Sequence, residues 1–286
     1  MTTTSTAVDF MRAAPPSLNG NTPWAQRYAG TLKRVFTDAA ARAPRTLQQH
    51  LGPSELGVMC DRQVAGKLAA LPATNHVVDP WPSIVGTACH AWAAEAFTMD
   101  NLKYGYTRWV AEQRVTPHPE HPGTADLYDT AELAVVDHKF LGDSSMAKIR
   151  KEPPRKYKVQ LLLYGLGYLN AGLPVDKVVL AAYPRTASSL DGLYIWHHDT
   201  DYPGEDGALL AYVFEQTAYR KNWARHILAG GNDEQQMARL RDVPADTGED
   251  RDSECYFCPF YRPQAARDGL YGCPGPDSTS ALPTPV

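Results

Sequence analysis

The stretch LAVVDHKF, residues 133–140, decides how this chain is expected to fold. Its first half, Leu133 to Val136, has the composition of a buried β-strand, and three ionisable residues follow directly. Alternate side chains of a strand share one face, so Asp137 and Lys139 are expected on one side of the sheet and His138 on the other. The strand therefore leaves the core by presenting a carboxylate and an ammonium at one edge.

Apolar periodicity on either side of this stretch predicts the remaining elements. Helices are expected at 23–43, from about 54, at 84–98, at 155–172 and at 204–230, and strands at 108–116, 123–129, 133–140, 177–186 and 192–199. The first three strands form a meander with short turns. This order predicts a mixed α/β domain with one central sheet flanked by helices.

The predicted domain organisation is a single folded domain between two polar ends. Residues 1–22 and 274–286 have the composition of a disordered leader and tail. The domain, 23–273, has three expected parts: a helical part 23–100, a core 101–230 that carries the chemistry, and a Cys-bearing part 231–273.

Composition narrows the class of protein. The net charge of −4 argues against a protein that coats DNA by charge alone. The N-terminus lacks the pattern of a signal peptide, and the strongest apolar run, 161–169, is too short to cross a bilayer. A cytoplasmic protein without membrane contact is expected, so its five cysteines favour a metal or cluster over disulfides.

The side chains near LAVVDHKF predict a metal site. Asp126 lies on the preceding strand, and a hairpin brings it near Asp137, where two carboxylates repel each other unless a cation lies between them. Mg²⁺ or Mn²⁺ is the natural occupant, with His90 as a third ligand whose nitrogen favours Mn²⁺. The alternative is a solvated hairpin end with an ordinary ion pair. Glu112 and Glu95 are weaker candidates for metal ligands.

Polar and basic groups after the strand fit a phosphate backbone. Gln160 and Tyr164 are four residues apart on one helix face, although an ordinary amphipathic helix also has such positions. Six basic residues, which also fit a solvated surface, stand just before them: Lys148, Arg150, Lys151, Arg155, Lys156 and Lys158.

Four cysteines have a spacing that suits metal binding. Cys255 and Cys258 form a C-x₂-C pair, Cys273 follows it, and Cys60 lies far upstream. Four thiolates close either a zinc site or a [4Fe–4S] cluster, which would clamp the two ends of the domain together. Cys89 is expected to be a small packed residue.

The order of these motifs resembles the PD-(D/E)XK nuclease superfamily, and within it the RecB-like exonuclease branch. The resemblance spans about residues 50–275 and rests on His90, on GTAD with Asp126, on VVDHK with Asp137 and Lys139, and on QLLLY with Gln160 and Tyr164. It implies a restriction-endonuclease-like core. It also implies that His90, Asp126, Asp137 and the backbone carbonyl of His138 hold the metal, that Lys139 assists hydrolysis, and that the Gln160/Tyr164 helix contacts DNA.

The cysteines resemble those of the iron–sulfur subset of this branch, which includes the CRISPR-associated adaptation exonucleases and the AddB nuclease domain. The resemblance implies a [4Fe–4S] cluster on Cys60, Cys255, Cys258 and Cys273. The gap before Cys273 is longer than is usual in that subset, so zinc stays open.

The expected function is a metal-dependent DNA exonuclease that acts on linear or single-stranded DNA ends. Phage or prokaryotic recombination and repair is the expected setting, with recombination proteins as partners and the bacterial host cytoplasm as the location of a phage-encoded protein. Two alternatives stay open: a non-cleaving, cluster-bearing DNA-binding module of a recombination or packaging complex, and an endonuclease of the same superfamily.

Overall fold

The computed structural model describes residues 22–42, 51–75, 80–245, 255, 257–262 and 272–276. The predicted leader up to residue 21 and the predicted tail from residue 277 lie outside these residues. The chain forms two compact units, Met1–Gln48 and Gln49–Val286. Among the described residues, no helix is both long and apolar enough to cross a membrane.

The first unit contributes helix α2 (Pro23–Ala41). The helix begins where Thr22 accepts a hydrogen bond from the backbone N–H of Ala25 at 3.1 Å, and Pro23 occupies the first turn, where it removes no needed donor. Trp24 and Tyr28 stack on each other one turn apart, with ring centroids separated by 5.0 Å.

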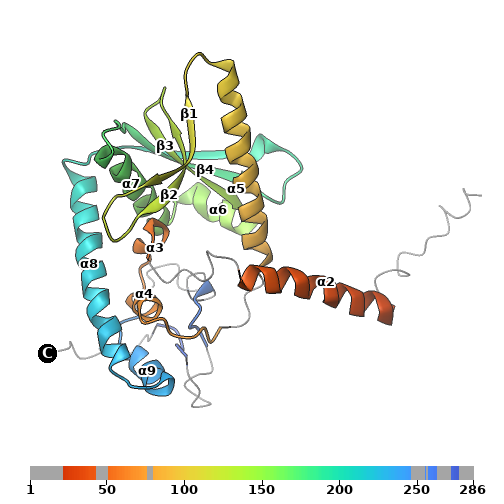
Figure 1. The fold of residues 1–286 in the computed structure, drawn as a ribbon, viewed down its shortest axis with the longest axis vertical. Helices are drawn as coiled ribbons and strands as arrows, with labels where there is room; N and C mark the ends of the chain where they lie inside the picture. The colour runs from red at the N-terminus through yellow and green to blue at the C-terminus, as the bar shows by residue number, and fades with distance from the viewer. Residues whose placement is uncertain are drawn as a thin grey trace, which may run out of the picture. The chain divides into compact units, whose positions relative to one another are not determined.

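The second unit contains the sheet and the other helices of the described residues (Figure 1). Its elements are, in chain order, α3 (Pro53–Leu56), α4 (Asp61–Leu68), α5 (Trp81–Asp100), η1 (Asn101–Lys103), β1 (Trp109–Val115), β2 (Gly123–Asp129), β3 (Ala134–Leu141), α6 (Asp143–Lys151), α7 (Arg155–Asn170), β4 (Lys177–Pro184), η2 (Leu190–Gly192), β5 (Tyr194–Asp199), α8 (Glu205–Leu228) and α9 (Asp233–Leu240).

The five strands form one mixed sheet in the order β1-β2-β3-β4-β5. The predicted meander is confirmed, because β1 pairs antiparallel with β2 and β2 with β3. The chain then crosses over through α6 and α7, so that β4 runs parallel to β3, and β5 returns antiparallel to β4. The predicted class, a mixed α/β domain with a central sheet flanked by helices, is confirmed.

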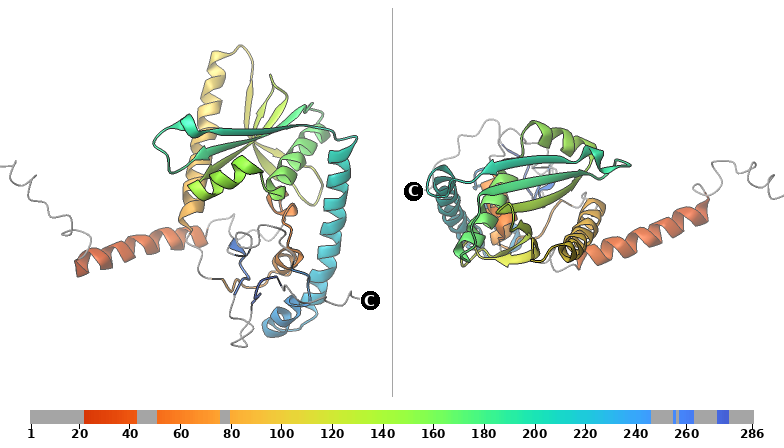
Figure 2. Two further views of the ribbon diagram at one scale, coloured as in Figure 1. Left: turned by 180° about the vertical axis from the view of Figure 1, so that it is seen from behind. Right: turned by 90° about the horizontal axis from the view of Figure 1, so that it is seen from above.

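Helix α7 forms the centre of the main core. It is apolar around most of its circumference, and most of its residues from Val159 to Tyr168 are buried. Tyr168 stacks on Tyr128 of β2 with ring centroids 4.6 Å apart, which places α7 against one face of the sheet. Helix α5 lies beside the sheet in both views of Figure 2. It contacts the opposite face, where the rings of Phe97 and His138 stack with their centroids 5.4 Å apart.

A second, smaller core lies where α4, α8 and α9 meet the Cys-bearing segments (Figure 1). Trp223 and Ile227 of α8 pack there with Leu240 of α9, and with Cys258 and Cys273. The C-terminal cysteines therefore belong to the folded structure and contribute apolar surface to it.

Two helices differ from the expectation. Residues 143–151 form α6 and residues 233–240 form α9, whereas the sequence pattern assigned no element to either segment. Both are short and polar, and each buries only two apolar side chains, Met146 and Ile149 in α6 and Met237 and Leu240 in α9. Helices of this kind depend on tertiary packing, so their local pattern is weak.

The helix expected from residue 54 is interrupted, and α3 and α4 flank the break. Arg220 of α8 is fully buried and explains it, because its guanidinium donates to the carbonyls of Leu56, Val58 and Met59 at 3.3, 2.6 and 3.1 Å. The same guanidinium pairs with Asp61 at 2.6 Å. A distant cation thus satisfies carbonyls that a continuous helix would have used itself.

Gly57 provides the first testable prediction. A Cβ at this position would lie 2.7 Å from the Cα of Lys156 and 2.9 Å from the Cβ of Val159, so Gly57→Ala would push α3 away from α7. We expect a loss of about 1–3 kcal/mol in the free energy of unfolding, measured by urea titration.

Gly86 is the matched control. A Cβ there meets nothing within 4 Å, and the residue lies inside α5. Gly86→Ala is expected to stabilise the protein by about 0.5–1 kcal/mol. Equal effects of the two substitutions would show that the contact between α3 and α7 is not tight.

Candidate metal and catalytic site

The site lies where β2 and β3 separate. Their ladder runs from Asp129↔Ala134 to Leu127↔Val136, and Asp126 and Asp137 come next on the two strands. Oδ2 of Asp126 accepts a hydrogen bond from the backbone N–H of His138 at 2.8 Å. The side chain of Asp126 thus satisfies an N–H group that would otherwise bond to the backbone of the neighbouring strand.

Asp137 and Lys139 share one face of β3, as predicted, and they face α7. The Nζ of Lys139 lies 2.5 Å from Oδ2 of Asp137. From α7, Gln160 donates to Oδ1 of Asp137 at 2.9 Å, and its own oxygen accepts from Lys139 at 3.4 Å. Lys139 also lies over the ring of Tyr157, 4.8 Å from its centroid. Both oxygens of Asp137 are thus held inside the protein.

His90 reaches the other carboxylate from α5. Its Nδ1 lies 3.3 Å from Oδ2 of Asp126. Its ring packs edge-to-face with the ring of Phe140, and the two ring centroids are 5.3 Å apart. The four predicted residues His90, Asp126, Asp137 and Lys139 therefore come from three elements and converge in one place.

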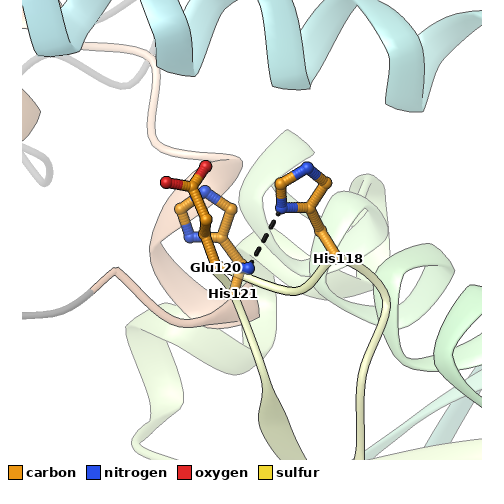
Figure 3. Close-up of side chains that lie close together, drawn as sticks. All are labelled: His118, Glu120 and His121. Atoms are coloured by element: carbon orange, nitrogen blue, oxygen red, sulfur yellow. Dashed lines mark hydrogen bonds between the residues drawn. The ribbon is translucent and has the colours of Figure 1, made fainter.

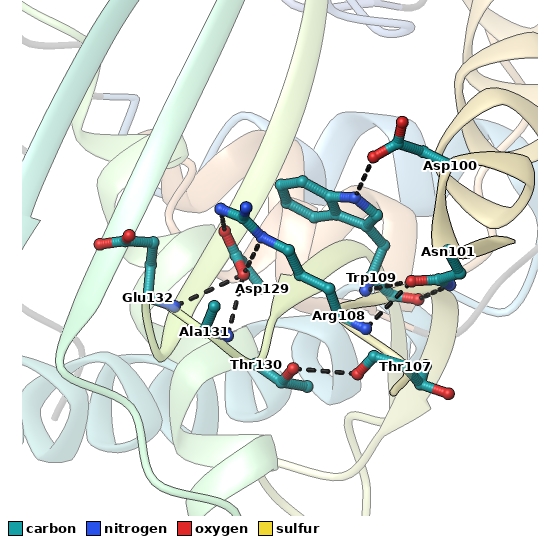
Figure 4. Close-up of polar contacts among 9 residues, drawn as sticks. All are labelled: Asp100, Asn101, Thr107, Arg108, Trp109, Asp129, Thr130, Ala131 and Glu132. Atoms are coloured by element: carbon teal, nitrogen blue, oxygen red, sulfur yellow. Dashed lines mark hydrogen bonds and ion pairs between the residues drawn. The ribbon is translucent and has the colours of Figure 1, made fainter. Parts of the chain in front are cut away.

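A hydrogen-bond network fastens α5 to the strand that follows it (Figure 4). Asn101, at the end of α5, accepts from the backbone N–H groups of Arg108 and Trp109 at 3.0 and 2.8 Å and donates to the carbonyl of Trp109 at 2.8 Å. Asp129 holds Arg108 through two bonds, at 3.1 and 2.9 Å. Because α5 carries His90, this network contributes to the position of the imidazole.

Burial sets the charges of the site. Burial, together with the neighbouring Asp137, raises the pKa of Asp126 to about 8. Burial opposes the charged form of Lys139, but Asp137, Tyr157 and Asp126 together outweigh burial, so the pKa of Lys139 is raised. Burial lowers the pKa of His138 to about 4, so its ring is neutral at pH 7. The site therefore contains an acidic pair of which only one member is neutralised by a fixed cation.

Glu112 joins this site although the sequence pattern gave it little weight. A nitrogen of His90 and carboxylate oxygens of Glu112 and Asp126 all lie within 4.8 Å of one another. On β1, Glu112 stands between the pairs Ala111↔Leu127 and Gln113↔Ala125, so the position opposite it on β2 is that of Asp126. The φ of Glu112 is 52°, which is left-handed inside a strand. Glu112 could have been identified from the sequence by working out which residue of β1 stands opposite Asp126 in the hairpin.

The other predicted residues have varied surroundings. The side chain of His138 faces away from Asp137, and its Nδ1 lies 3.3 Å from the hydroxyl of Tyr183. Gln160 and Tyr164 are buried and hydrogen-bonded to each other at 3.2 Å. Their predicted contact with DNA stays a prediction.

The six predicted basic residues are divided between two helices. Lys148, Arg150 and Lys151 lie on α6, and Arg155, Lys156 and Lys158 lie on α7. Arg150 donates to the carbonyl of Gly192, Arg155 donates to the carbonyl of Gly57, and Lys158 pairs with Glu152. Part of the basic run therefore also makes contacts within the protein.

The four predicted cysteine ligands come together. Cys60, Cys255, Cys258 and Cys273 line one small cavity of about 10 Å³, and all four are buried and free of disulfide bonds. Burial raises the pKa of Cys60 and of Cys258 to about 12, and the neighbouring thiols of the group add to the effect. Cys89 lies outside this group and is half-buried.

The long gap before Cys273 is closed by backbone pairing. Tyr261 and Cys273 form a β-bridge, in which Cys273 donates to the carbonyl of Phe260 and Arg262 donates to the carbonyl of Cys273, both at 2.7 Å. The chain thus returns beside the C-x₂-C pair, whatever the length of the segment between them.

A second group of His and Glu side chains lies in the loop between β1 and β2 (Figure 3). His118, Glu120 and His121 have ligand atoms within 4.8 Å of one another. However, Lys221 pairs with Glu120 at 2.8 Å, and Nδ1 of His118 accepts the backbone N–H of Glu120 at 3.2 Å. These contacts tie the loop to α8 and to its own backbone, and we assign no metal to this group.

Comparison with protein-family models found no match, and none was found among curated proteins. Among solved structures, the chain is similar to SSO0001, with a TM-score of 0.38 and 15% identity over 67% of this chain and 85% of the other. It is also similar to a phage-related exonuclease from Haemophilus somnus 129PT, with a TM-score of 0.31 and 12% identity over 48% of this chain and 69% of the other.

Asp126 leads to a prediction about pH. In the unfolded chain its carboxyl ionises near its ordinary pKa of about 4. Between about pH 4 and pH 8 the folded state therefore binds more protons at this group, and the contribution of Asp126 to the stability of the metal-free protein falls as the pH rises. We expect the free energy of unfolding of wild type to fall relative to Asp126→Asn by on the order of 1 kcal/mol per pH unit in this window.

The measurement is urea unfolding of both proteins in EDTA at several pH values. Because Asp126→Asn keeps all other titrating groups, the difference between the two proteins reports this carboxyl and its interactions with Asp137 and Lys139. The same pH slope for both proteins would contradict the raised pKa.

Proposed function

We propose that the chain is a metal-dependent DNA exonuclease that hydrolyses phosphodiester bonds at linear or single-stranded DNA ends. One observation carries the proposal: Asp126 and Asp137 meet at the opening of the sheet, with Lys139 on one carboxylate and His90 on the other. This arrangement matches the order of residues that the sequence shares with the RecB-like nucleases.

The donors present suit a divalent cation. His90 and Asp126 would hold Mg²⁺ or Mn²⁺, with Asp137 and the backbone carbonyl of His138 completing the set that the resemblance implies. When bound, such an ion supplies Lewis-acid polarisation of the phosphate and activation of the attacking water.

The chain itself would supply positioning and charge. Lys139, held by Asp137 and Gln160, places a fixed ammonium beside the metal ligands, where it stabilises negative charge that develops on the phosphate. Gln160 orients Asp137, and Tyr164 in turn holds Gln160. The basic residues of α6 and α7 whose side chains reach solvent would follow the phosphate backbone of the DNA.

We further propose that Cys60, Cys255, Cys258 and Cys273 hold a [4Fe–4S] cluster, with zinc as the alternative. Support comes from the four buried thiols around one small cavity, since burial of this kind suits a ligand set that is closed to solvent. The centre would be structural, because it joins the start of the second unit to its end. Recombination and repair is the proposed setting.

Lys139→Ala tests the chemistry. We expect cleavage of end-labelled linear DNA with Mg²⁺ or Mn²⁺ to fall by about 10²-fold or more, because the ammonium beside the scissile phosphate is lost. Lys177→Ala, on the neighbouring strand β4, is the control and should cleave like wild type. Normal cleavage by purified Lys139→Ala would overturn the assignment of this site.

The form of the DNA separates the alternatives within the same assay. An exonuclease degrades linear DNA and spares closed circles, whereas an endonuclease also cuts the circles. If wild type binds DNA and cleaves neither form with Mn²⁺, it is a non-cleaving module instead.

Cys60→Ala tests the cysteine centre. We expect the anaerobically purified variant to contain less iron and acid-labile sulfide, or less zinc, than wild type. Its solubility or stability should decrease more than its rate of DNA cleavage. Removal of a structural cross-link typically costs about 2–5 kcal/mol in the analogous case of disulfides. Cys89→Ala is the control and should keep wild-type metal content. A soluble Cys60→Ala protein of unchanged stability would refute the structural role.

A further inference from the structure

Arg62 is a buried cation beside the four cysteines. It lies on α4, two residues after Cys60, and only 2% of its surface is exposed. One guanidinium nitrogen, Nη1, donates to the sulfur of Cys273 at 3.2 Å and to the carbonyl of Gly275 at 3.4 Å. Nε and Nη2 donate to the carbonyls of Val243 and Arg241 at 2.8 and 3.0 Å.

The partners of Arg62 leave its charge unbalanced. They are three carbonyls and one sulfur, and among the described residues no carboxylate lies within ion-pair distance of its guanidinium. Arg220 provides the comparison inside the same protein, because it is equally buried and pairs with the carboxylate of Asp61 at 2.6 Å. A buried charge without a counter-ion is strongly destabilising, so the surroundings of Arg62 call for an anion.

The sulfur of Cys273 is the partner that becomes anionic when a metal binds. A metal centre with four thiolate ligands carries net negative charge, as a zinc site or as a [4Fe–4S] cluster. Hydrogen bonds to ligand sulfurs also adjust the stability and the reduction potential of such a centre.

We propose that Arg62 is the counter-ion and positioning residue of the cysteine centre, acting through its hydrogen bond to the sulfur of Cys273. This inference rests on the proposed centre. Arg62 makes the loaded protein more stable by balancing the thiolate charge, and it makes the metal-free protein less stable because the same guanidinium is then buried without a counter-ion. The centre and the fold of the C-terminal part are coupled through this one side chain.

The experiment compares wild type, Arg62→Gln and Arg62→Lys as anaerobically purified proteins. Release of iron or zinc to a chelator is followed by absorbance, and loaded and metal-free forms are unfolded in parallel. We expect Arg62→Gln to release the metal about tenfold faster or more, as for a lost hydrogen bond to a charged group. Arg62→Lys, which keeps the charge, should lie between the two. With an iron–sulfur cluster, the reduction potential of Arg62→Gln should become more negative.

Arg241→Gln is the matched control. Arg241 donates to the carbonyl of Gly272 at 3.3 Å. Gly272 precedes Cys273, and this hydrogen bond goes to the backbone and not to the sulfur of Cys273. We expect its metal release and its potential to match wild type. Arg62→Gln should also reduce the difference in stability between loaded and metal-free protein, whereas Arg241→Gln should leave that difference unchanged.

The outcomes separate the two levels of the proposal. Wild-type protein that contains neither iron nor zinc would refute the centre itself. If wild type is loaded and Arg62→Gln keeps its release rate, potential and stability difference, the centre stands and the role of Arg62 is refuted. If Arg62→Gln does not fold, Arg62→Lys decides. Metal release faster than wild type supports the role of Arg62, and release at the wild-type rate refutes it.

Discussion

The structure depends on the position of two carboxylates, Asp126 and Asp137, at the point where two neighbouring strands separate. Two neighbouring carboxylates, of which Asp137 is buried and Asp126 half-buried, repel each other when both are charged, unless other groups neutralise them. The two carboxylates have different partners. Asp137 is enclosed by Lys139 and Gln160, while Asp126 accepts the backbone N–H of His138 and faces His90.

Two helices on opposite faces of the sheet bring these partners to the carboxylates. Gln160 comes from α7, whose apolar residues pack into the main core on the face of β3 that carries Asp137. His90 comes from α5, which the network around Asn101 ties to the start of β1. The polar site thus rests on two helices whose positions are determined by ordinary packing and hydrogen bonding.

The cysteine region is linked to this site through α3. Arg220 holds the carbonyls that follow α3 and the carboxylate of Asp61, directly on either side of Cys60. At Gly57 the chain touches α7 beside Lys156 and Val159, the residue before Gln160. Cys60 itself lies in the main core with α7, whereas Cys258 and Cys273 lie in the smaller core. A centre on Cys60 would therefore support the start of the helix that orients Asp137.

Much of this was accessible from the sequence alone, because it depends on local patterns. The alternation of LAVVDHKF determined that Asp137 and Lys139 share a face, the meander followed from three short runs of β-forming residues, and the spacing of the cysteines indicated a common site. The tertiary structure decided the rest: the polar helices α6 and α9, the break between α3 and α4, the approach of Glu112, and the burial of Arg62. Each of these depends on a partner far away in the chain, on strand register or on a buried charge, and such partners leave no periodic pattern in the sequence around them.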